Sequence, residues 1–583
     1  VCAISKERLT RVKHDSGFFR EVVDYCLEAA GIPLGRVDRV VRNCYVLPVP
    51  ELERRLLALN DPYHLPPRDQ ERARSSPLFL SDAEKVVTVS HHLAHAYSAF
   101  AVSPFEEGAV MVVDGVGSYR ADVTEDVPSA DEAPPLARES ESFYRFRGAE
   151  PECLRKVWLL PARGRLNDEF HQMDGLGALY SRVSSYAFGD WNKCGEVMGL
   201  APYGRLDLDP MVELRDGELI FRPWGREMSS PFLGSGDDAW ERSPHRSHWA
   251  DCARRVQEDT ERALLARAHW LHERTRTPNL TLAGGVALNC VANGRILRET
   301  PFERVFVQPA AGDDGVALGC ALYGHLALDR RARTFVMKNA SWGRTYDEPW
   351  IRAATSSFGV RVAAGRRRSP DVARETARLL ARGKVVGWFQ GGSEFGPRAL
   401  GHRSILADPR DPRMKGRINA RVKHRQAFRP YAPAVLAERV GDYFEGVEQS
   451  PFMLLAARVR PRMRDKIPAV VHVDGSARVQ TVHADRAPRF HALLRAFEER
   501  TGIGVLLNTS FNVRGDPIVE DPFHAVETFL LTRLDVLVLH DWILRKRALH
   551  RVLEPWIRFA VRLRRNLGSE ALLERAARRA LDV

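Results

Sequence analysis

The strongest constraint on the fold is a local pattern that recurs along the chain. A short apolar segment leads into a turn containing glycine or a polar residue, and a stretch of helical periodicity follows. The first half is predicted to contain a helix around 91–100 and strands at 86–89, 109–113, 280–283 and 305–307. The second half is predicted to contain a helix over 371–382 and strands at 385–389, 505–507 and 536–539. Strands that alternate with helices are typical of α/β domains, so we predict an α/β fold in both halves.

The length of 583 residues predicts more than one domain. A stretch without a clear helix or strand pattern (a soft stretch), 332–349, precedes a new series of helix and strand patterns. We place the domain boundary there. The predicted division is a first domain at 1–340, a second at 341–545 and a basic helical tail at 546–583. A second soft stretch, 125–138, is rich in acidic, proline and alanine residues and is predicted to be an inserted surface loop.

Four residues of the first half form a candidate metal site. His91 and His95 lie four positions apart on the predicted helix, which places both imidazoles on one face. Asp114 and Asp313 each follow a predicted strand, beside glycines that allow a ligand to approach the backbone. A helical histidine pair is as often a packing feature, so the two carboxylates carry the prediction. Two imidazoles and two carboxylates suit Fe(II), Mn(II) or Zn(II), among which the sequence leaves the choice open.

Glycine-rich turns at predicted helix starts are candidate phosphate sites, because free backbone N–H groups point out of a helix N-terminus. Each turn alone is a weak signal, since a tight strand-to-helix turn needs glycine anyway. Three such turns in one α/β domain favour a two-lobed nucleotide cleft. No P-loop motif is present. The three turns are 114–117, 283–289 and 312–315.

The second half carries a cluster of basic residues among glycine-rich loops. A guanidinium group can donate two parallel hydrogen bonds to the oxygens of one phosphate. A cluster of basic residues of this kind therefore suits a polyphosphate bound together with a second anion. RNA is the rival ligand, but the glycine loops and the small polar residues of 508–512 favour a small, enclosed anion. The basic residues are Arg398, Arg403, Lys415, Arg417, Lys423, Arg425, Arg429 and Arg478.

Composition narrows the class of protein. The chain has eight cysteines and no Cys-x-x-Cys pair, which argues against zinc ribbons, redox dithiols and disulfide scaffolds and fits a reducing cytoplasm. No apolar run reaches the roughly 18–20 residues of a membrane helix. The net charge of +12 comes largely from 545–579, where eleven basic residues face three acidic ones. We interpret this segment as an amphipathic helix rather than a nucleic-acid site.

Together, seven stretches resemble the O-carbamoyltransferases of nodulation-factor and antibiotic biosynthesis. Two of them read Glu-Arg-Leu-Thr-Arg-Val-Lys-His at 7–14 and His-His-Leu-Ala-His-Ala at 91–96. The resemblance runs over nearly the whole chain and leaves out only the tail after about residue 545. The other five stretches are 197–204, 283–289, 312–319, 391–408 and 507–517.

The resemblance implies an N-terminal actin/hexokinase-like (ASKHA) domain and a C-terminal α/β domain similar to the carbamoyl-adenylate-forming partner of tRNA threonylcarbamoylation. The implied reaction has two steps. The C-terminal domain converts carbamoyl phosphate and ATP, which is bound with Mg(II), to carbamoyl-adenylate and pyrophosphate. The hydroxyl of a small-molecule acceptor then attacks at the metal site, and AMP leaves. Nucleic acid and membrane are not expected partners.

The resemblance also implies roles for individual residues. The metal, iron(II) in the family, would be bound by His91, His95, Asp114 and Asp313. Lys13 and Asn289 would contact the adenylate in the first domain, with Gly284 and Gly285 in its nucleotide turn, and Lys13 and His92 are the predicted catalytic residues. Carbamoyl phosphate and ATP would be bound by Arg398, Lys423, Arg429, Arg478, Asn508, Ser510 and Asn512.

One departure from the family pattern affects the transfer step. Family members open with a strand and a His-Asp turn ahead of the motif that starts here at Glu7. We therefore expect either an N-terminally truncated chain or an incomplete transfer site, and with it poor carbamoyl transfer by these 583 residues. Full transfer would instead mean that another residue, His92 or His14, serves as the base. A lesser departure is Glu196, where many relatives carry lysine.

Three other functions remain alternatives. A tRNA-modifying enzyme of the threonylcarbamoyl type would use the same two folds, but the 391–408 and 507–517 stretches favour the small-molecule branch. Hydrogenase-maturation carbamoyltransferases should carry Cys-x-x-Cys motifs, which are absent. A non-catalytic nucleotide sensor would not need the basic cluster.

The arginine- and alanine-rich composition indicates a high-GC organism, in which antibiotic tailoring is the favoured setting. The acceptor stays open among a sugar, a macrolide and an ansamycin.

Overall fold

A computed structural model describes most of the chain. The described residues are 2–15, 20–43, 86–135, 137–160, 173–222, 243–333, 335–357, 364–547 and 555–556. They divide into two compact units. Unit 1 comprises Val1–Ser16, Asn339–Met453 and Ala457–Val583, and unit 2 comprises Gly17–Lys338 with Leu454–Ala456.

Unit 2 contains a five-stranded sheet in the order β5-β4-β3-β8-β9. β3, β8 and β9 are parallel to one another, whereas β4 and β5 add an antiparallel edge. A separate parallel pair joins β1 (Val40–Arg42) to β2 (Val86–Thr88), and β6 (Val212–Arg215) forms a hairpin with β7 (Glu218–Phe221). The strands of the larger sheet are β3 (Glu107–Val113), β4 (Arg138–Arg147), β5 (Glu150–Leu159), β8 (Asn279–Ala283) and β9 (Arg304–Val307).

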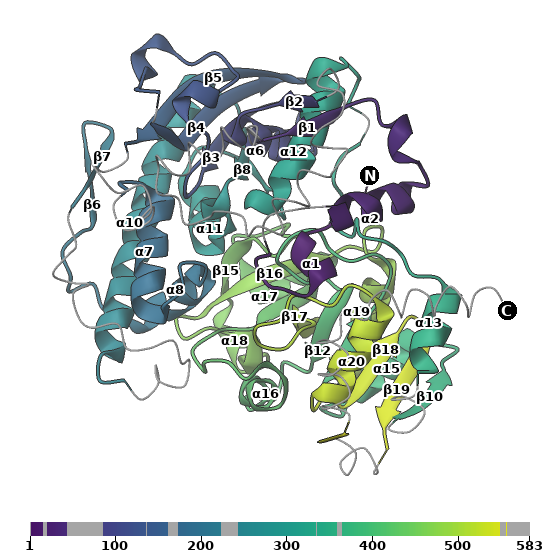
Figure 1. Cartoon of the computed structure of the whole chain (residues 1–583). Helices are drawn as coiled ribbons and strands as arrows, with labels where there is room; N and C mark the ends of the chain where they lie inside the picture. Colours follow the sequence, from purple (N-terminus) through teal and green to yellow (C-terminus); the bar gives the residue numbers. More distant parts are fainter. Residues whose placement is uncertain are drawn as a thin grey trace. The chain divides into compact units, whose positions relative to one another are not determined.

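Helices cover both faces of this sheet. On one face, α6 (His91–Phe100) packs on β3 and β8 with α12 (Val316–Tyr323) alongside it (Figure 1). Phe146 of β4 stacks on Phe100 of α6, whereas Phe143 of the same strand meets Trp270 on the other face. Trp270 belongs to α10 (Arg246–Thr275), a 30-residue helix. The other helices of unit 2 are α2 (Arg20–Ala30), α7 (Leu176–Phe188), α8 (Cys194–Leu200) and α11 (Cys290–Glu299).

Unit 1 contains a ten-stranded mixed sheet in the order β10-β19-β18-β11-β12-β17-β13-β16-β15-β14. Its central strands are almost wholly buried, as expected for a sheet with covered faces. The strands are β10 (Ala364–Arg368), β11 (Val386–Phe389), β12 (Arg403–Ala407), β13 (Ala432–Leu436), β14 (Phe444–Glu445), β15 (Leu455–Val459), β16 (Ser476–Val482), β17 (Val505–Ser510), β18 (Val536–Leu539) and β19 (Trp542–Lys546).

Three of the helices of unit 1 pack closely on one another or on the sheet: α15 on α19, and α20 on β11 and β18. None of the described helices of the chain is both long and apolar enough to cross a membrane. The helices of unit 1 are α1 (Lys6–Thr10), α13 (Glu348–Thr355), α15 (Val372–Ala381), α16 (Met414–Ile418), α17 (Val440–Tyr443), α18 (Pro461–Arg464), α19 (Pro488–Thr501) and α20 (Pro522–Leu531).

The predicted α/β architecture and the elements on which it rests are confirmed. The helix predicted around 91–100 has those bounds, and each predicted strand appears within a few residues of its expected position. The structural division differs from the predicted one at the N-terminus, because Val1–Ser16 groups with the C-terminal residues rather than with the first domain. Of the predicted helical tail at 546–583 the structure describes only 546–547 and 555–556, and Lys546 there ends β19 rather than beginning a helix.

Candidate metal centre and anion cluster

The metal-site histidines lie on a helix that is buried along its whole length. All ten residues of α6 are buried, and His91 and His95 lie one turn apart on it. The helix can be enclosed because its neighbours approach closely. A side chain at Gly319 of α12 would overlap the carbonyl oxygen of Ala94, so glycine permits this helix contact. Asn43, from the end of β1, lies 2.8 Å from Nδ1 of His91 and orients the ring, so that Nε2 faces the carboxylates.

The two carboxylates come from the ends of strands on the same sheet. Asp114 follows β3 directly, and its Oδ1 accepts a 2.8 Å hydrogen bond from the backbone N–H of Gly285, which follows β8. Asp313 lies in the loop after β9, at the start of the turn that leads into α12. Because β3, β8 and β9 are parallel, their carboxyl ends meet at one edge of the sheet, and the structure brings the predicted ligands together there.

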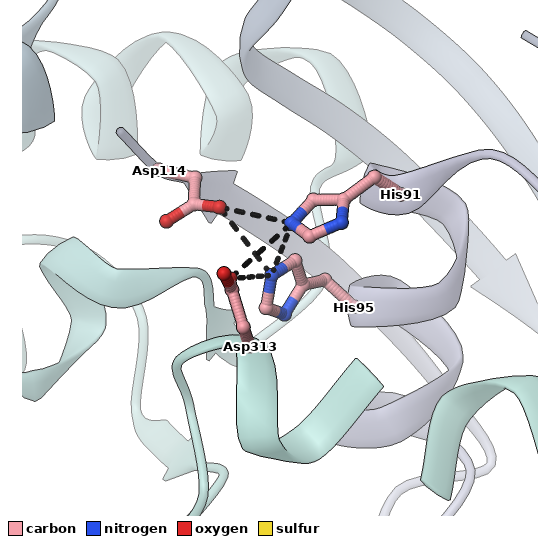
Figure 2. Close-up of side chains that lie close together, drawn as sticks. All are labelled: His91, His95, Asp114 and Asp313. Carbon is pink, nitrogen blue, oxygen red and sulfur yellow. Dashed lines mark hydrogen bonds and ion pairs between the residues drawn. The ribbon is translucent and has the colours of Figure 1, made fainter. Parts of the chain in front are cut away.

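The four side chains converge on one point (Figure 2). Nε2 of His91 lies 3.1 Å from Oδ2 of Asp114 and 3.4 Å from Oδ1 of Asp313. Nε2 of His95 lies 3.5 and 3.7 Å from the same two oxygens, and the two Nε2 atoms are 3.1 Å apart. All four ligand atoms lie within 4.8 Å of one another. Asp313, with 80% of its side chain exposed, forms the open side of the cluster.

The pKa values within the quartet, that is His91, His95, Asp114 and Asp313, follow from these contacts. Burial disfavours the imidazolium form of His91, but hydrogen bonds to Asp114 and Asp313 outweigh it and raise the pKa to about 10. The pKa of His95 is raised by the same two partners, against its burial. Desolvation and Asp114 oppose ionisation of Asp313, yet the two histidines lower its pKa to about 2. The carboxylates therefore remain ionised, and a positive charge is favoured between them.

The donor set fits a divalent cation. Four ligands at about 2.0–2.2 Å in tetrahedral arrangement lie about 3.3–3.5 Å from one another, close to the separations found here. Two imidazole nitrogens that face each other at 3.1 Å also need a shared cation or proton between them. Imidazole and carboxylate ligands suit Zn(II), Fe(II) and Mn(II) alike. The quartet is therefore a candidate metal centre without a preference among these ions.

His92, a predicted catalytic residue, lies beside the quartet rather than in it. It is fully buried, and its Nδ1 lies 2.8 Å from the hydroxyl of Ser142, while Nε2 has no hydrogen-bond partner among the described residues. Burial and then the neighbouring Lys156 hold the pKa of His92 well below its usual value, so the ring is neutral near pH 7.

The predicted nucleotide turn is built tightly around the end of β3. Gly284 has φ +86°, and a side chain there would overlap the carbonyl of Val113. Gly285 donates its N–H to Asp114, as described above. The amide of Asn289 is already engaged: Oδ1 accepts from the N–H of Ala292, which caps α11, and both amide atoms pair with Gln257. The Asn289 side chain and the backbone N–H groups of Gly285, Ala287 and Asn289 are thus all engaged within unit 2.

In unit 1, Lys423 is the centre of the predicted anion cluster. Its ammonium donates to the backbone oxygens of Ser510 and Asn512, at 2.6 and 3.1 Å, and to their side-chain oxygens, at 3.1 and 2.5 Å. Burial lowers its pKa well below 10.5, and Arg425, Arg429 and Lys13 lower it further. The structure thus brings together four of the predicted anion-site residues, Lys423, Arg429, Ser510 and Asn512, at the end of β17.

Asn508 has a structural role in the same strand. Its amide nitrogen donates to the carbonyl of Ala399, at 2.9 Å, and to Oε1 of Gln480, at 2.7 Å, and Gln480 in turn donates to the carbonyl of Leu400. These bonds fix the loop that carries Arg398, next to Ala399. Arg398 and Arg478 are partly exposed.

The N-terminal segment packs on this unit. Arg8, buried within α1, donates to the carbonyl of Gly396 at 2.8 Å. Arg11 donates to the carbonyls of Pro517 and Ile518, at 3.0 and 2.7 Å. Lys13, exposed just beyond, therefore belongs to unit 1 and acts on the pKa of Lys423. This differs from the prediction that Lys13 lies in the first domain, because the Glu-Arg-Leu-Thr-Arg motif binds the loops of the C-terminal half.

Comparison with known families agrees with this two-unit layout. A family model described as Carbamoyltransferase N-terminus matches residues 71–322, and one described as Carbamoyltransferase C-terminus matches residues 377–546. The chain belongs to the carbamoyltransferase family. The resemblance inferred from the sequence motifs is thereby confirmed.

Two relatives match this carbamoyltransferase along most of its length. Nodulation protein NolNO of Sinorhizobium fredii is 36% identical over 579 residues, which cover 97% of this chain and 79% of the relative. Protein sll1178 of Synechocystis sp. is 37% identical and covers 94% of this chain and 93% of its own length. Among solved structures, that of T. kodakarensis HypF aligns with 53% of this chain and 43% of its own, with 16% identity and a TM-score of 0.30.

Sequence reasoning missed the residues that contact the candidate metal ligands, or the helix that carries them, in this carbamoyltransferase. Asn43 follows β1 and gave no motif signal. Ser118, Glu139 and Lys156 bond to one another or to the start of α6, although they lie far apart in the sequence. The only sequence signal for these three residues was that Ser118 lies four positions after the predicted ligand Asp114.

Proposed function

We propose that this carbamoyltransferase is an ATP-dependent O-carbamoyltransferase that acts on a hydroxyl of a small natural product. The observation that carries the proposal is the buried Lys423, which lies close enough to Arg425, Arg429 and Lys13 for all three cations to lower its pKa, after burial itself. A bound polyanion would relieve their mutual repulsion. Adenylation requires such a site, since it must bind triphosphate and carbamoyl phosphate together.

The proposed activation occurs in unit 1. Water cleaves carbamoyl phosphate to carbamate and phosphate, and a carbamate oxygen then attacks the α-phosphorus of ATP. The bond to pyrophosphate breaks, and carbamoyl-adenylate remains. Lys423 and Arg429, with the predicted ligands Arg398 and Arg478, would stabilise the negative charge on the transferring oxygens. Because Ser510 and Asn512 fix the Lys423 ammonium, it needs no rearrangement to meet the anion.

The proposed transfer occurs in unit 2, which we propose to be the actin/hexokinase-like domain of the family. A divalent cation bound by His91, His95, Asp114 and Asp313 supplies a Lewis acid for the phosphate of the adenylate. The acceptor hydroxyl attacks the carbamoyl carbon, the bond to AMP breaks, and the hydroxyl proton passes to a base. His92 is the predicted base, and its depressed pKa keeps the ring neutral, as a base requires. Asp313, on the open side, lies where substrates can reach the centre.

The test is release of pyrophosphate by the full chain supplied with Mg²⁺, ATP and carbamoyl phosphate. We expect release by the wild type and loss of it in Lys423→Met. Lys384→Met is the matched control, because Lys384 lies in unit 1 but faces Asp535 at 3.9 Å. Absence of pyrophosphate from the wild type would overturn the proposal in favour of a nucleotide sensor. Modification of a tRNA transcript, without carbamoylation of any small hydroxyl compound seen by mass spectrometry, would favour the tRNA-modifying alternative.

A further inference from the structure

The start of the metal-binding helix is capped by side chains from other elements. Ser90, the N-cap residue of α6, makes no capping bond with its own side chain. The first three backbone N–H groups instead donate to side chains elsewhere. Ser90 donates to Oγ1 of Thr124 at 3.1 Å, His91 to Oγ of Ser118 at 2.9 Å, and His92 to Oε2 of Glu139 at 3.2 Å. The unpaired donors of a helix N-terminus are thus satisfied by three separate segments.

Glu139 and Ser118 link the two segments that carry the candidate metal ligands, namely the start of α6 and the turn after β3. Oε2 of Glu139 also accepts from the N–H of Ser118, at 3.0 Å. Ser118 lies four residues after Asp114, in the turn that leaves β3. The start of α6, with His91, and the turn that follows Asp114 are therefore bonded to the same carboxylate. A displacement of that carboxylate would change the separation of the two ligands.

The Glu139 carboxylate is held by a buried cation. Lys156 of β5 is 2% exposed and donates to Oε1 of Glu139, to the hydroxyl of Ser142 at 3.2 Å and to that of Tyr144 at 3.1 Å. Its ammonium also lies 2.7 Å from Glu125. A buried carboxylate without such a partner carries a large desolvation penalty. Lys156 thus pairs with the Glu139 carboxylate at the N-terminal end of α6, where the helix dipole favours a negative charge.

A β-bulge aims Glu139 at this helix. The pairing of β4 with β5 shifts register between Glu139 and Glu141. Glu139 lies with Ser142 and Lys156 on the face that carries α6, whereas Glu141 bonds to Arg267 of α10 on the opposite face. In a regular strand, residues two apart share a face. The bulge separates them, as bulges beside active sites commonly do.

We propose that Lys156, Glu139 and Ser118 are positioning residues of the metal centre, which set the distance between the His91/His95 helix and Asp114. They do not contact the metal. The inference rests on the metal centre that is part of the proposed function, but not on the identity of the acceptor or the carbamoyl donor.

The test is titration of the full chain with Co²⁺, followed by visible absorption, which reports the number and geometry of the ligands. Loss of an outer-shell partner typically weakens metal binding 10–100-fold. We expect a loss of about this size, with an altered band, in Lys156→Met and in Ser118→Ala. Ser118→Thr keeps the hydroxyl acceptor and should bind Co²⁺ like the wild type. Ser118 is partly exposed, so its variants should fold even where Lys156→Met does not.

Arg267→Met is the matched control for loss of a buried ion pair. Arg267 and Glu141 are 3% and 2% exposed, with Nε and Oε2 2.8 Å apart, on the far face of the same strand. This variant should lose thermal stability while its Co²⁺ affinity and spectrum stay those of the wild type. Unchanged affinity and spectrum in Ser118→Ala would overturn the positioning role and leave the metal centre intact. A wild-type chain that binds no Co²⁺ would overturn the metal centre and this inference together, whatever the result for pyrophosphate release.

Discussion

Asp313 differs from the other three metal-site residues in its access to solvent. Its side chain is 80% exposed, whereas that of His95 is fully buried and that of Asp114 is 8% exposed. The three buried residues are integral to the packing of unit 2, so their replacement would alter the fold as well as the site. Asp313 is thus the position at which metal binding can be separated from folding.

Asp313→Asn should lower bound metal while the metal-free chain still folds, although it loses the contacts of Asp313 with His91 and His95. The substitution keeps the size of the side chain but removes an anionic ligand, and we expect a loss of affinity of at least about 10-fold. Elemental analysis after gel filtration gives the metal content. Asp314→Asn changes the adjacent exposed carboxylate, which lies outside the quartet, and should leave the metal content unchanged. Equal metal in Asp313→Asn and the wild type would remove Asp313 from the ligand set.

Protonation of Lys423 should be coupled to anion binding. Its folded pKa lies well below 10.5, first because of burial and then because of Arg425 and Arg429. A bound anion favours the ammonium form and raises this pKa, so binding between the two values takes up a proton. The affinity for pyrophosphate should accordingly fall as pH rises through the lowered pKa. Below that pKa the ammonium is already formed, and no uptake is expected.

Calorimetry in two buffers of different ionisation enthalpy measures this uptake. The binding enthalpy of the wild type should differ between the buffers on the alkaline side, and that of Lys384→Met should behave likewise. In Lys423→Met the difference should vanish. If wild-type enthalpies agree in both buffers from pH 7 to about 10, Lys423 is not the group that titrates.

At the scale of elements, α1 is a short helix that joins two loops of unit 1. Arg8 bonds to the loop at Gly396, and Arg11 bonds to the turn at Pro517 and Ile518. That turn is connected to the anion cluster, because Asn512, a partner of Lys423, donates to the carbonyl of Asp516 at 2.7 Å. Five helical residues thus support a site made by the C-terminal half of the chain.

Arg11→Ala should weaken activation as well as folding. Two hydrogen bonds from a charged donor are lost, each worth about 1.5–3 kcal/mol before relaxation. We expect a lower free energy of unfolding by urea and a higher KM for ATP in pyrophosphate release. Arg11→Lys keeps the charge but cannot bond two carbonyls from one planar group, so its effect should be intermediate. A KM equal to that of the wild type in Arg11→Ala would show that the turn does not support the anion cluster.

Elements with strong local signals could be predicted from the sequence, and the metal quartet followed from them. The bounds of the α6 helix were correct because its apolar and histidine pattern is unbroken. The contact of Glu139 with the start of α6 could not be predicted. A β-bulge turns its side chain to the face opposite that of Glu141, and no local sequence pattern encodes that shift. The pairing of the Asn289 amide with Gln257 could not be predicted for a related reason, since Gln257 lies on another helix. In both cases the position of the side chain depends on a neighbouring element that lies far away in the sequence.

At the scale of the whole molecule, unit 1 is discontinuous in sequence. Val1–Ser16, Asn339–Met453 and Ala457–Val583 form one compact unit, and Gly17–Lys338 intervenes between the first part and the second. The buried Arg8 contact shows that the first part is integral to the packing of unit 1. Residues 339–547 alone should therefore fold less stably than their position in the chain suggests.

A fragment of residues 339–547 should melt at a lower temperature than the same fragment joined to residues 2–15 by a flexible linker. The difference arises because only the second fragment can form the Arg8 and Arg11 hydrogen bonds. Calorimetry or circular dichroism measures both melting temperatures. As a control, the linked fragment with Arg11→Ala should fall between the two. Equal melting temperatures would show that the N-terminal segment is dispensable for unit 1.

The split of unit 1 also fixes an order of events on the ribosome. The Arg8 helix leaves the exit tunnel first, but its partners at Gly396 and Ile518 are made only after the whole of Gly17–Lys338. At about 5–20 residues per second, synthesis of that stretch takes about a quarter of a minute to a minute. A nascent chain thus synthesises Gly17–Lys338, the main part of unit 2, before the last strands of unit 1. Reactive carbamoyl-adenylate would then not be made by any chain that has yet to synthesise the half proposed to consume it.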